Sequence, residues 1–290
     1  MKYYNYFPGC SSAEGSAKAY NKSILAIAKV LDIDLKELDQ WNCCGSTPFS
    51  GYDELGSLSL ATRNLALAEK RGFDLVTPCS ACYVILNEAN TTLKRSRGTK
   101  AKIDESLAAG GLSYNGDIRV RHILDIIVND IGYEKIAAKV KKDLSGLKIA
   151  PYYGCQIVRP DSSFDHADNP ITLDKLAYSL KAETVDFPLK TACCGSSVAL
   201  SEEGVALGLI RKILDCAAKS GAECIVTVCP LCQMNLDGYQ STINRKFGAK
   251  YNIPVLFFTQ LMGIAFGLSE DELDMKTNIV SARKTLARYL

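Results

Sequence analysis

The sequence predicts an α/β fold made of two copies of one unit, each built on a parallel sheet. The first observation is a cysteine pattern that occurs twice: a Gly-Cys, then a Cys-Cys-Gly, then a Cys-x-x-Cys. The second is the spacing, because 34 residues lie between the Cys-Cys pair and the Cys-x-x-Cys in both copies. The third is that apolar runs and amphipathic segments alternate in the same order in both halves. Together they indicate an internal duplication.

Local signals place the elements of the first half. Apolar residues at helical spacing favour helices, apolar or β-branched runs favour buried strands, and Gly72 is a natural helix stop. The expected elements are a strand from Lys2 that ends at Gly9-Cys10, a helix over 17–31, an extended segment over 34–41, a helix over 55–71, a strand over 73–78 and a helix over 83–96. Segment 97–119 is polar, and we expect an exposed excursion there.

The second half repeats this order. The expected elements are a strand from Lys148 that ends at Gly154-Cys155, a helix over 171–180, an extended segment over 183–187, a helix over 203–219, a strand over 222–228 and a helix over 233–247. The apolar run from Ile253 to Leu268 is too short to span a bilayer, so we expect a buried strand that leads into a helix.

These elements predict two duplicated Rossmann-like α/β domains in a pseudo-two-fold arrangement. We expect the N-terminal domain over 1–145, the C-terminal domain over 146–268 and a helical tail over 269–290. The tail has acidic residues early and basic residues late, which suits a helix dipole. Such a tail either docks on a partner or packs against its own chain, and the sequence leaves both open.

Composition bounds the class of protein. The 290 residues are 47% apolar and 23% charged, which is typical of a globular protein. The net charge of +2 gives no field that favours nucleic acid. The N-terminus lacks the apolar region of a secretory signal. We therefore expect a cytoplasmic protein without direct membrane insertion, whose cysteines are more suited to metal binding than to disulfides.

Ten of the twelve cysteines belong to the repeated pattern. In each half they follow strands, whose ends gather in one crevice of a parallel sheet, and the Cys-x-x-Cys begins a helix whose N-terminus favours thiolate. Two adjacent thiolates seldom reach one metal ion, so the Cys-Cys pairs indicate more than one metal atom. Gly45 and Gly195 would let the backbone approach a bulky inorganic core closely.

Other uses of the cysteines compete with this interpretation. Structural zinc takes four ligands and leaves one cysteine per half unused. A thioredoxin-like dithiol would use residues 77–82 and leave the Cys-Cys pairs unexplained. Structural disulfides do not suit a reducing compartment. An iron–sulfur site uses all ten cysteines and is the interpretation that we favour.

The two-copy pattern resembles the cysteine-rich CCG domains in the B subunit of heterodisulfide reductase, over nearly the whole chain. The resemblance implies two noncubane 4Fe–4S clusters, each held by five cysteines. The first cysteine set would be Cys10, Cys43, Cys44, Cys79 and Cys82. The second cysteine set would be Cys155, Cys193, Cys194, Cys229 and Cys232.

The resemblance also implies a reaction and partners. Family members cleave a disulfide between their two clusters, and their electrons come through a small ferredoxin-like subunit that is linked to a flavoprotein subunit of the same complex. The substrate would be a disulfide, a thiol or a sulfur-carrier protein. Gln156 stands where methanogen members more often have His, which favours a relative outside methanogenesis. The main alternative is an electron-transfer iron–sulfur subunit of a dehydrogenase complex without its own substrate, and a zinc-stabilised assembly module is a further one.

A few residues outside the pattern are candidates for the site. Arg159 follows Cys155 by four residues and would bind an anionic substrate tail, although a surface arginine is the alternative. His166 lies in a loop and would supply a proton to a departing thiolate, unless it is simply solvated. We expect His122 to be a structural residue at the start of an apolar helix. Cys216 and Cys224 are expected to pack as small apolar residues.

Overall fold

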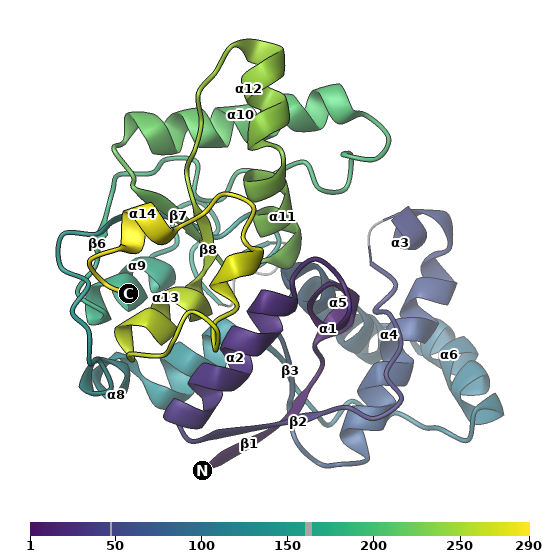
Figure 1. Ribbon diagram of the computed structural model, residues 1–290. Helices are drawn as coiled ribbons and strands as arrows, with labels where there is room; N and C mark the ends of the chain where they lie inside the picture. Colours follow the sequence, from purple (N-terminus) through teal and green to yellow (C-terminus); the bar gives the residue numbers. More distant parts are fainter. Residues whose placement is uncertain (47, 160–163) are drawn as a thin grey trace.

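The computed structural model describes residues 1–46, 48–159 and 164–290, and each half of it contains a four-stranded parallel sheet (Figure 1). The strand orders are β2-β1-β3-β4 and β6-β5-β7-β8, so each half has its first strand beside its second and third. Every strand pair is parallel. The predicted fold class and the duplication are therefore confirmed.

The elements of the first half follow the predicted order with some additions. Strands are β1 (Lys2–Tyr6), β2 (Ile33–Glu37), β3 (Leu75–Thr77) and β4 (Val120–His122). Helices are α1 (Gly9–Ala13), α2 (Lys18–Val30), α3 (Pro48–Tyr52), α4 (Glu54–Glu69), α5 (Ser80–Arg95), α6 (Arg97–Ala109), α7 (Ile123–Asp125), the π-helix η1 (Ile126–Ile131) and α8 (Tyr133–Ala138).

The second half repeats the sheet. Its strands are β5 (Lys148–Tyr152), β6 (Glu183–Thr184), β7 (Cys224–Thr227) and β8 (Val255–Phe257). Its helices are α9 (Thr172–Ser179), α10 (Glu203–Lys219), α11 (Pro230–Gly238), α12 (Gln240–Phe247), α13 (Phe258–Ala265), the 3₁₀ helix η2 (Met275–Thr277) and α14 (Arg283–Leu286). The helix expected over 233–247 is thus two helices, and the first begins directly after Cys229.

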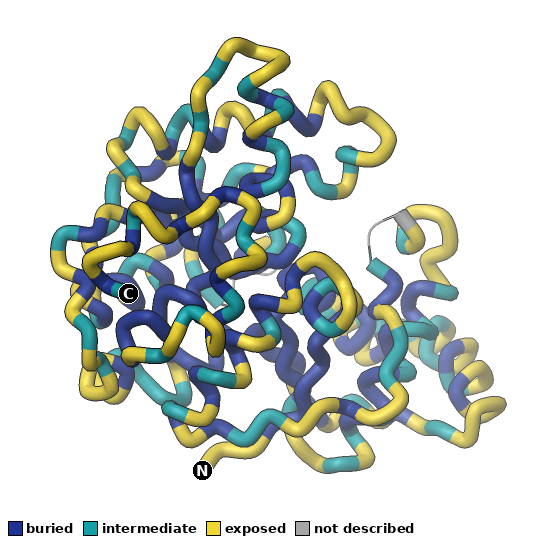
Figure 2. The backbone as a smooth tube through the Cα atoms, viewed as in Figure 1, coloured by how far each residue is buried: buried dark blue, intermediate teal, exposed yellow. Residues whose placement is uncertain are grey.

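The two halves share one apolar core. Helices α2 and α13 pack together between the sheets, where the buried segments of both halves meet (Figures 1 and 2). The ring of Tyr20 stacks on Phe257 with centroids 4.1 Å apart. Beside it, the buried hydroxyls of Ser23 and Thr259 share a 2.6 Å hydrogen bond. The halves are therefore joined by a continuous interior as well as by the chain.

The expectation of an exposed excursion over 97–119 was wrong for its first part. Residues 97–109 form α6, which packs against α4 and α5. Ser96 caps this helix by accepting from the amide of Thr99. Ile103 and Leu107 are buried in the core of the first half. These two residues are four apart on one helix face, and the polar residues around them mask that spacing.

The segment 269–290 is less helical than expected. It contains only η2 and α14, and its Leu273 and Leu286 are buried in the shared core. The buried carboxylate of Asp237 accepts from the backbone amides of Ile279 and Val280 at 2.7 and 3.0 Å. The segment thus packs against its own chain. No helix in the described parts of the chain has the length and apolar character needed to cross a membrane.

Candidate functional site

Both Cys-x-x-Cys motifs lie where a buried strand passes into a helix. Cys79 follows β3 and is the N-cap residue of α5, and Cys229 follows β7 and is the N-cap residue of α11. Amides of the first turn of α11 donate to the Cys229 sulfur. The thiols of Cys232 and Cys79, with these amides, hold the pKa of Cys229 well below its ordinary value. This confirms the predicted helix starts and shows how a helix N-terminus favours thiolate.

The Gly-Cys motifs pack directly on the second cysteine of the Cys-x-x-Cys. A Cβ on Gly9 would lie 3.1 Å from the sulfur of Cys82, and a Cβ on Gly154 would lie 2.9 Å from the sulfur of Cys232. Both glycines have positive φ angles, +72° and +70°. Sequence reasoning noted these glycines only as part of the motif. Their role is to leave room for a sulfur atom.

Gly45 and Gly195 act through their backbone. A Cβ on Gly45 would face Ser57 of α4, and one on Gly195 would face Ala206 of α10, so a side chain at either position would meet a helix. Their φ angles are positive, +80° and +74°. The amide of Gly195 donates to the Cys193 sulfur at 3.3 Å, and that of Gly45 donates to Cys43. The backbone therefore approaches ligand sulfur; its approach to a cofactor stays a prediction.

The thiols within each cysteine set are in mutual contact. In the first set they form one continuous series of hydrogen-bonded sulfurs, in the order Cys10, Cys43, Cys44, Cys82 and Cys79. In the second set Cys155 donates to Cys193, and the sulfurs of Cys194 and Cys232 lie 3.4 Å apart. Cys232 also contacts Cys229. All ten predicted ligands are thus gathered into two groups.

Equivalent cysteines in the two sets have equivalent pKa shifts. The Cys155 thiol donates to Cys193 and lowers the pKa of Cys193 to about 6. The Cys10 thiol lowers the pKa of Cys43 in the same way, and the pKa of each donor is raised by the thiolate that it faces. The first cysteine of each Cys-Cys pair is therefore held as a thiolate by its neighbours.

The two cysteine sets meet. The thiols of Cys79 and Cys229 face each other closely enough that the pKa of Cys79 is raised and the pKa of Cys229 is lowered, so the Cys-x-x-Cys motifs of the two halves lie side by side. Leu231, which lies inside the second motif, packs against the apolar cores of both halves. The hydroxyl of Tyr20 crosses from α2 to donate to the carbonyl of Val228 at 2.9 Å. Both sets are therefore parts of one site between the halves.

The donor set fits the iron–sulfur interpretation in type and in number. Each half offers five thiols, one more than zinc or a cubane cluster takes. Among the described residues, no group of three or more His, Cys, Asp or Glu side chains is arranged to hold a single metal ion. The cysteines instead form extended groups of neighbouring sulfurs. A cluster of several irons with five thiolate ligands suits such a group.

Both cysteine sets reach the surface, the first through two cysteines and the second through one. Cys10 and Cys43 are exposed, whereas Cys44, Cys79 and Cys82 are buried. The two exposed cysteines line a cavity of about 870 Å³ together with Trp41, whose ring packs edge-on against Phe7. Glu14, Glu37 and Asp39 also line it, which makes its wall acidic. In the second set only Cys193 is exposed and Cys155 is half-buried.

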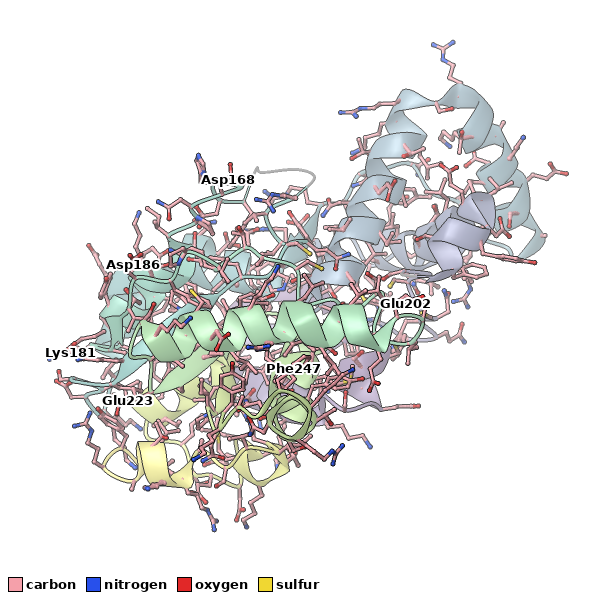
Figure 3. All side chains as sticks on the ribbon, turned by 90° about the horizontal axis from the view of Figure 1, so that it is seen from above. Asp168, Lys181, Asp186, Glu202, Glu223 and Phe247 are labelled. Atoms are coloured by element: carbon pink, nitrogen blue, oxygen red, sulfur yellow. The ribbon has the colours of Figure 1, made fainter. Side chains whose placement is uncertain are left out.

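Arg159 lies beside a cavity that both halves line. This cavity of about 530 Å³ is bounded by Arg159 from the second half and by Tyr83, Thr92 and Arg95 of α5 from the first. The guanidinium of Arg159 donates to Asp168 at 2.6 Å. Asp168 lies at the outer edge of the molecule in the view of Figure 3. Glu88 of α5 also lines the cavity, and the two arginines leave it with a net positive lining that suits an anion.

His166 is placed differently. Its side chain is exposed, and its Nδ1 accepts from the amides of Asp168 and Asn169, both at 3.1 Å. These contacts hold the turn over 166–169, and a role in proton transfer stays a prediction. Cys216 and Cys224 lie outside both cysteine sets. Cys224 is fully buried in the apolar core of the structure, as expected.

Relatives that align with most of the chain have different named roles. The chain is 39% identical over 286 residues to the 8-methylmenaquinol:fumarate reductase membrane anchor subunit of Wolinella succinogenes, with 98% of this chain and 99% of that protein covered. It is 34% and 35% identical over 263 residues to the B subunits of the CoB-CoM heterodisulfide reductases of Methanosarcina acetivorans and Methanosarcina mazei, with 89% of this chain and 87% of each relative covered. These relatives are subunits of multisubunit enzymes.

A solved structure shares the fold. The crystal structure of a hypothetical protein from Helicobacter pylori superposes with a TM-score of 0.78 at 15% identity, and the match covers 97% of this chain and 52% of that one. The cysteine-rich domain family CCG matches residues 4–87 and 149–237, which are the two segments that carry the two cysteine sets. The resemblance predicted from the motifs is therefore confirmed, and the chain belongs to the family of duplicated cysteine-rich CCG domains.

Proposed function

We propose that the two cysteine sets hold two noncubane 4Fe–4S clusters, and that the chain is the catalytic iron–sulfur subunit of a complex that reduces or forms a disulfide between them. The observation that carries this proposal is the contact between Cys79 and Cys229, which joins the two sets in one site. Separate sites would suit two independent relays. One shared site suits a reaction that needs two electrons at one place.

The bound clusters would supply two electrons, so that a disulfide and two protons become two thiols, or the reverse. The residues of the chain would do the rest. Arg159 would bind an anionic group of the substrate in the cavity beside α5. His166 would hold or release a proton at its imidazole. The amides of Gly45 and Gly195 would stabilise the thiolates of Cys43 and Cys193.

The partners follow from the same proposal. The chain has no ferredoxin-type run of closely spaced cysteines, so its electrons would come from a ferredoxin-like subunit and a flavoprotein subunit of the same complex. The cavity at Cys10 and Cys43 suits that contact, because the first set reaches the surface there. The substrate would be a disulfide, a thiol or a sulfur-carrier protein. Twelve free cysteines suit a reducing, cytoplasmic location.

A second candidate function has its own support. The relative that is 39% identical over 98% of this chain is named as a subunit of a methylmenaquinol:fumarate reductase. The chain would then transfer electrons within a fumarate reductase complex and would have no disulfide substrate. The two functions require the same cysteine ligands, so the ligands alone do not separate them.

A thiol titration separates the two functions. Purified oxidised complex would be mixed with 2-mercaptoethanesulfonate, an anionic thiol, and followed by electron paramagnetic resonance. A new paramagnetic signal that grows with thiol supports the disulfide reaction, and the Arg159→Gln variant should need more thiol to reach it. Absence of any thiol-dependent signal, together with fumarate-dependent reoxidation of the reduced complex, would replace the first proposal by the second.

A further inference from the structure

Lys190 is a buried lysine beside the second cysteine set that the proposed reaction does not use. It lies three residues before Cys193 and is only 9% exposed. Its Nζ donates to the carboxylate of Asp174 and to the carbonyl of Pro170, both at 3.0 Å. A buried ammonium is costly unless it is paired and hydrogen-bonded, and here the fold supplies both partners. The side chain of Lys190 is therefore held in one place.

The backbone of Lys190 holds the Gly-Cys turn of the second half. Its carbonyl accepts from the amide of Tyr153 at 2.8 Å and from the amide of Gly154 at 3.1 Å. These two residues directly precede Cys155. The segment that leads to Cys155 and the segment that leads to Cys193 are thus joined at one carbonyl oxygen.

The side chain of Tyr153 closes a ring of hydrogen bonds around this junction. It is fully buried, and its hydroxyl donates to the carboxylate of Asp174 at 2.7 Å and accepts from the amide of Leu173 at 2.6 Å. Asp174 lies in the first turn of α9. The ring runs from the Lys190 carbonyl to the amide of Tyr153, from its hydroxyl to Asp174, and from Asp174 back to the Lys190 ammonium.

The first half is built differently at the equivalent positions. Pro8 stands directly before the first Gly-Cys, where the second half has Tyr153, and a proline has no amide hydrogen to donate. Gln40 stands three residues before the first Cys-Cys pair, where the second half has Lys190. Gln40 is exposed, and its carbonyl accepts from the guanidinium of Arg63 at 2.7 Å. Lys190 therefore affects one cysteine set and not the other.

We propose that Lys190 is a positioning residue for the second cluster: its carbonyl and its ammonium together fix Cys155 relative to Cys193, so that both thiolates stay in place on the bound iron. This inference rests on the proposed pair of clusters and concerns how one of them is retained. It applies equally to the disulfide reaction and to electron transfer within a fumarate reductase complex.

The test compares variants of the iron-loaded protein within its complex. Lys190→Met removes the ammonium and keeps an apolar chain of similar length, and Lys190→Arg keeps a cation that can donate to Asp174. Tyr153→Phe removes only the hydroxyl of the ring. Gln40→Met is the matched control at the equivalent position of the first half. Iron would be withdrawn with bathophenanthroline disulfonate in the presence of iodoacetamide, and mass spectrometry would measure how fast the cysteines of each set become alkylated.

We expect Lys190→Met to accelerate the alkylation of Cys155 about 10- to 100-fold, the usual effect of losing a group that orients a metal ligand, and to leave Cys10 at the wild-type rate. Tyr153→Phe should act in the same direction, Lys190→Arg should restore slow release, and Gln40→Met should change neither rate.

An unchanged rate at Cys155 in Lys190→Met overturns the inference alone, as does equal acceleration at Cys10, which would indicate general loosening of the fold. If Lys190→Met does not fold, an unchanged rate at Cys155 in Tyr153→Phe overturns it. Wild-type protein that binds no iron overturns the proposed clusters and this inference together.

Discussion

At the scale of single residues, the site depends on which atoms face sulfur. The repeated spacing of the cysteines identifies them, so the ligands can be predicted from the sequence alone. The residues that shape the space around them, such as Gly9 and Gly154, touch cysteines that are more than 70 residues away in the chain. Only the folded structure brings those atoms together.

Replacing one ligand should empty one cluster. The Cys43→Ser variant is expected to lower the iron content from about eight to about four per chain, because under the proposed function each half would hold its own cluster of four irons. The matched control is Cys216→Ser, on α10 and outside both cysteine sets. Iron would be measured by mass spectrometry on purified protein. Full iron content in Cys43→Ser would contradict the assignment of this ligand.

A methyl group beside the second Cys-x-x-Cys should have a similar effect. The Gly154→Ala variant would place a Cβ 2.9 Å from the Cys232 sulfur, at a φ angle that disfavours alanine. We expect loss of the cluster of the second half and retention of the first. Gly208→Ala, on α10 where a Cβ meets open space, is the control. Equal iron in both variants would show that this close contact is unimportant.

At the scale of elements, the strand ends are easier to predict than the edges of the sheets. The buried strands β3 and β7 are continuous apolar runs, and both lead into a Cys-x-x-Cys, so pattern and motif agree. Strand β4 has three residues and passes directly into a helix, and the sequence pattern therefore assigns His122 to the helix. The apolar run from Ile253 to Leu268 does reveal β8. An alignment of the two halves at this strand is the signal that could have identified β4 and placed His122 at its end.

The packing of α6 can be tested by truncating its buried face. Leu107→Ala should lower the free energy of unfolding by about 2 to 4 kcal/mol, because it leaves a cavity against α4. Lys102→Ala, at an exposed position on the same helix, should change it little. Denaturant titration followed by circular dichroism measures both. Equal free energies of unfolding for the two variants would contradict the packing of α6 and would support an exposed segment over 97–109.

At the scale of the whole molecule, the two halves form one unit. The duplication predicts two sheets, but the sequence does not show that α2 and α13 pack against each other between them. That contact depends on which apolar face of each helix remains after its own sheet is covered. It also helps to bring Cys79 and Cys229 together, so the shared core positions the site.

The shared core should make the halves unfold together. We expect one cooperative transition in calorimetry of the iron-free protein, and Phe258→Ala should shift the entire transition by about 3 to 5 kcal/mol, since this ring is buried between the halves. Exposed Phe73→Ala is the control. Two separate transitions, with only one moved by Phe258→Ala, would show that the halves are independent.

The pairing of α2 with α13 also has a consequence for synthesis. Ribosomes make proteins from the N-terminus, so α2 emerges more than 200 residues before its partner helix exists. Until then, the apolar side chains of Tyr20 and Ile24 have nothing from the second half to cover them. Nascent chains with such uncovered surface are prone to aggregate.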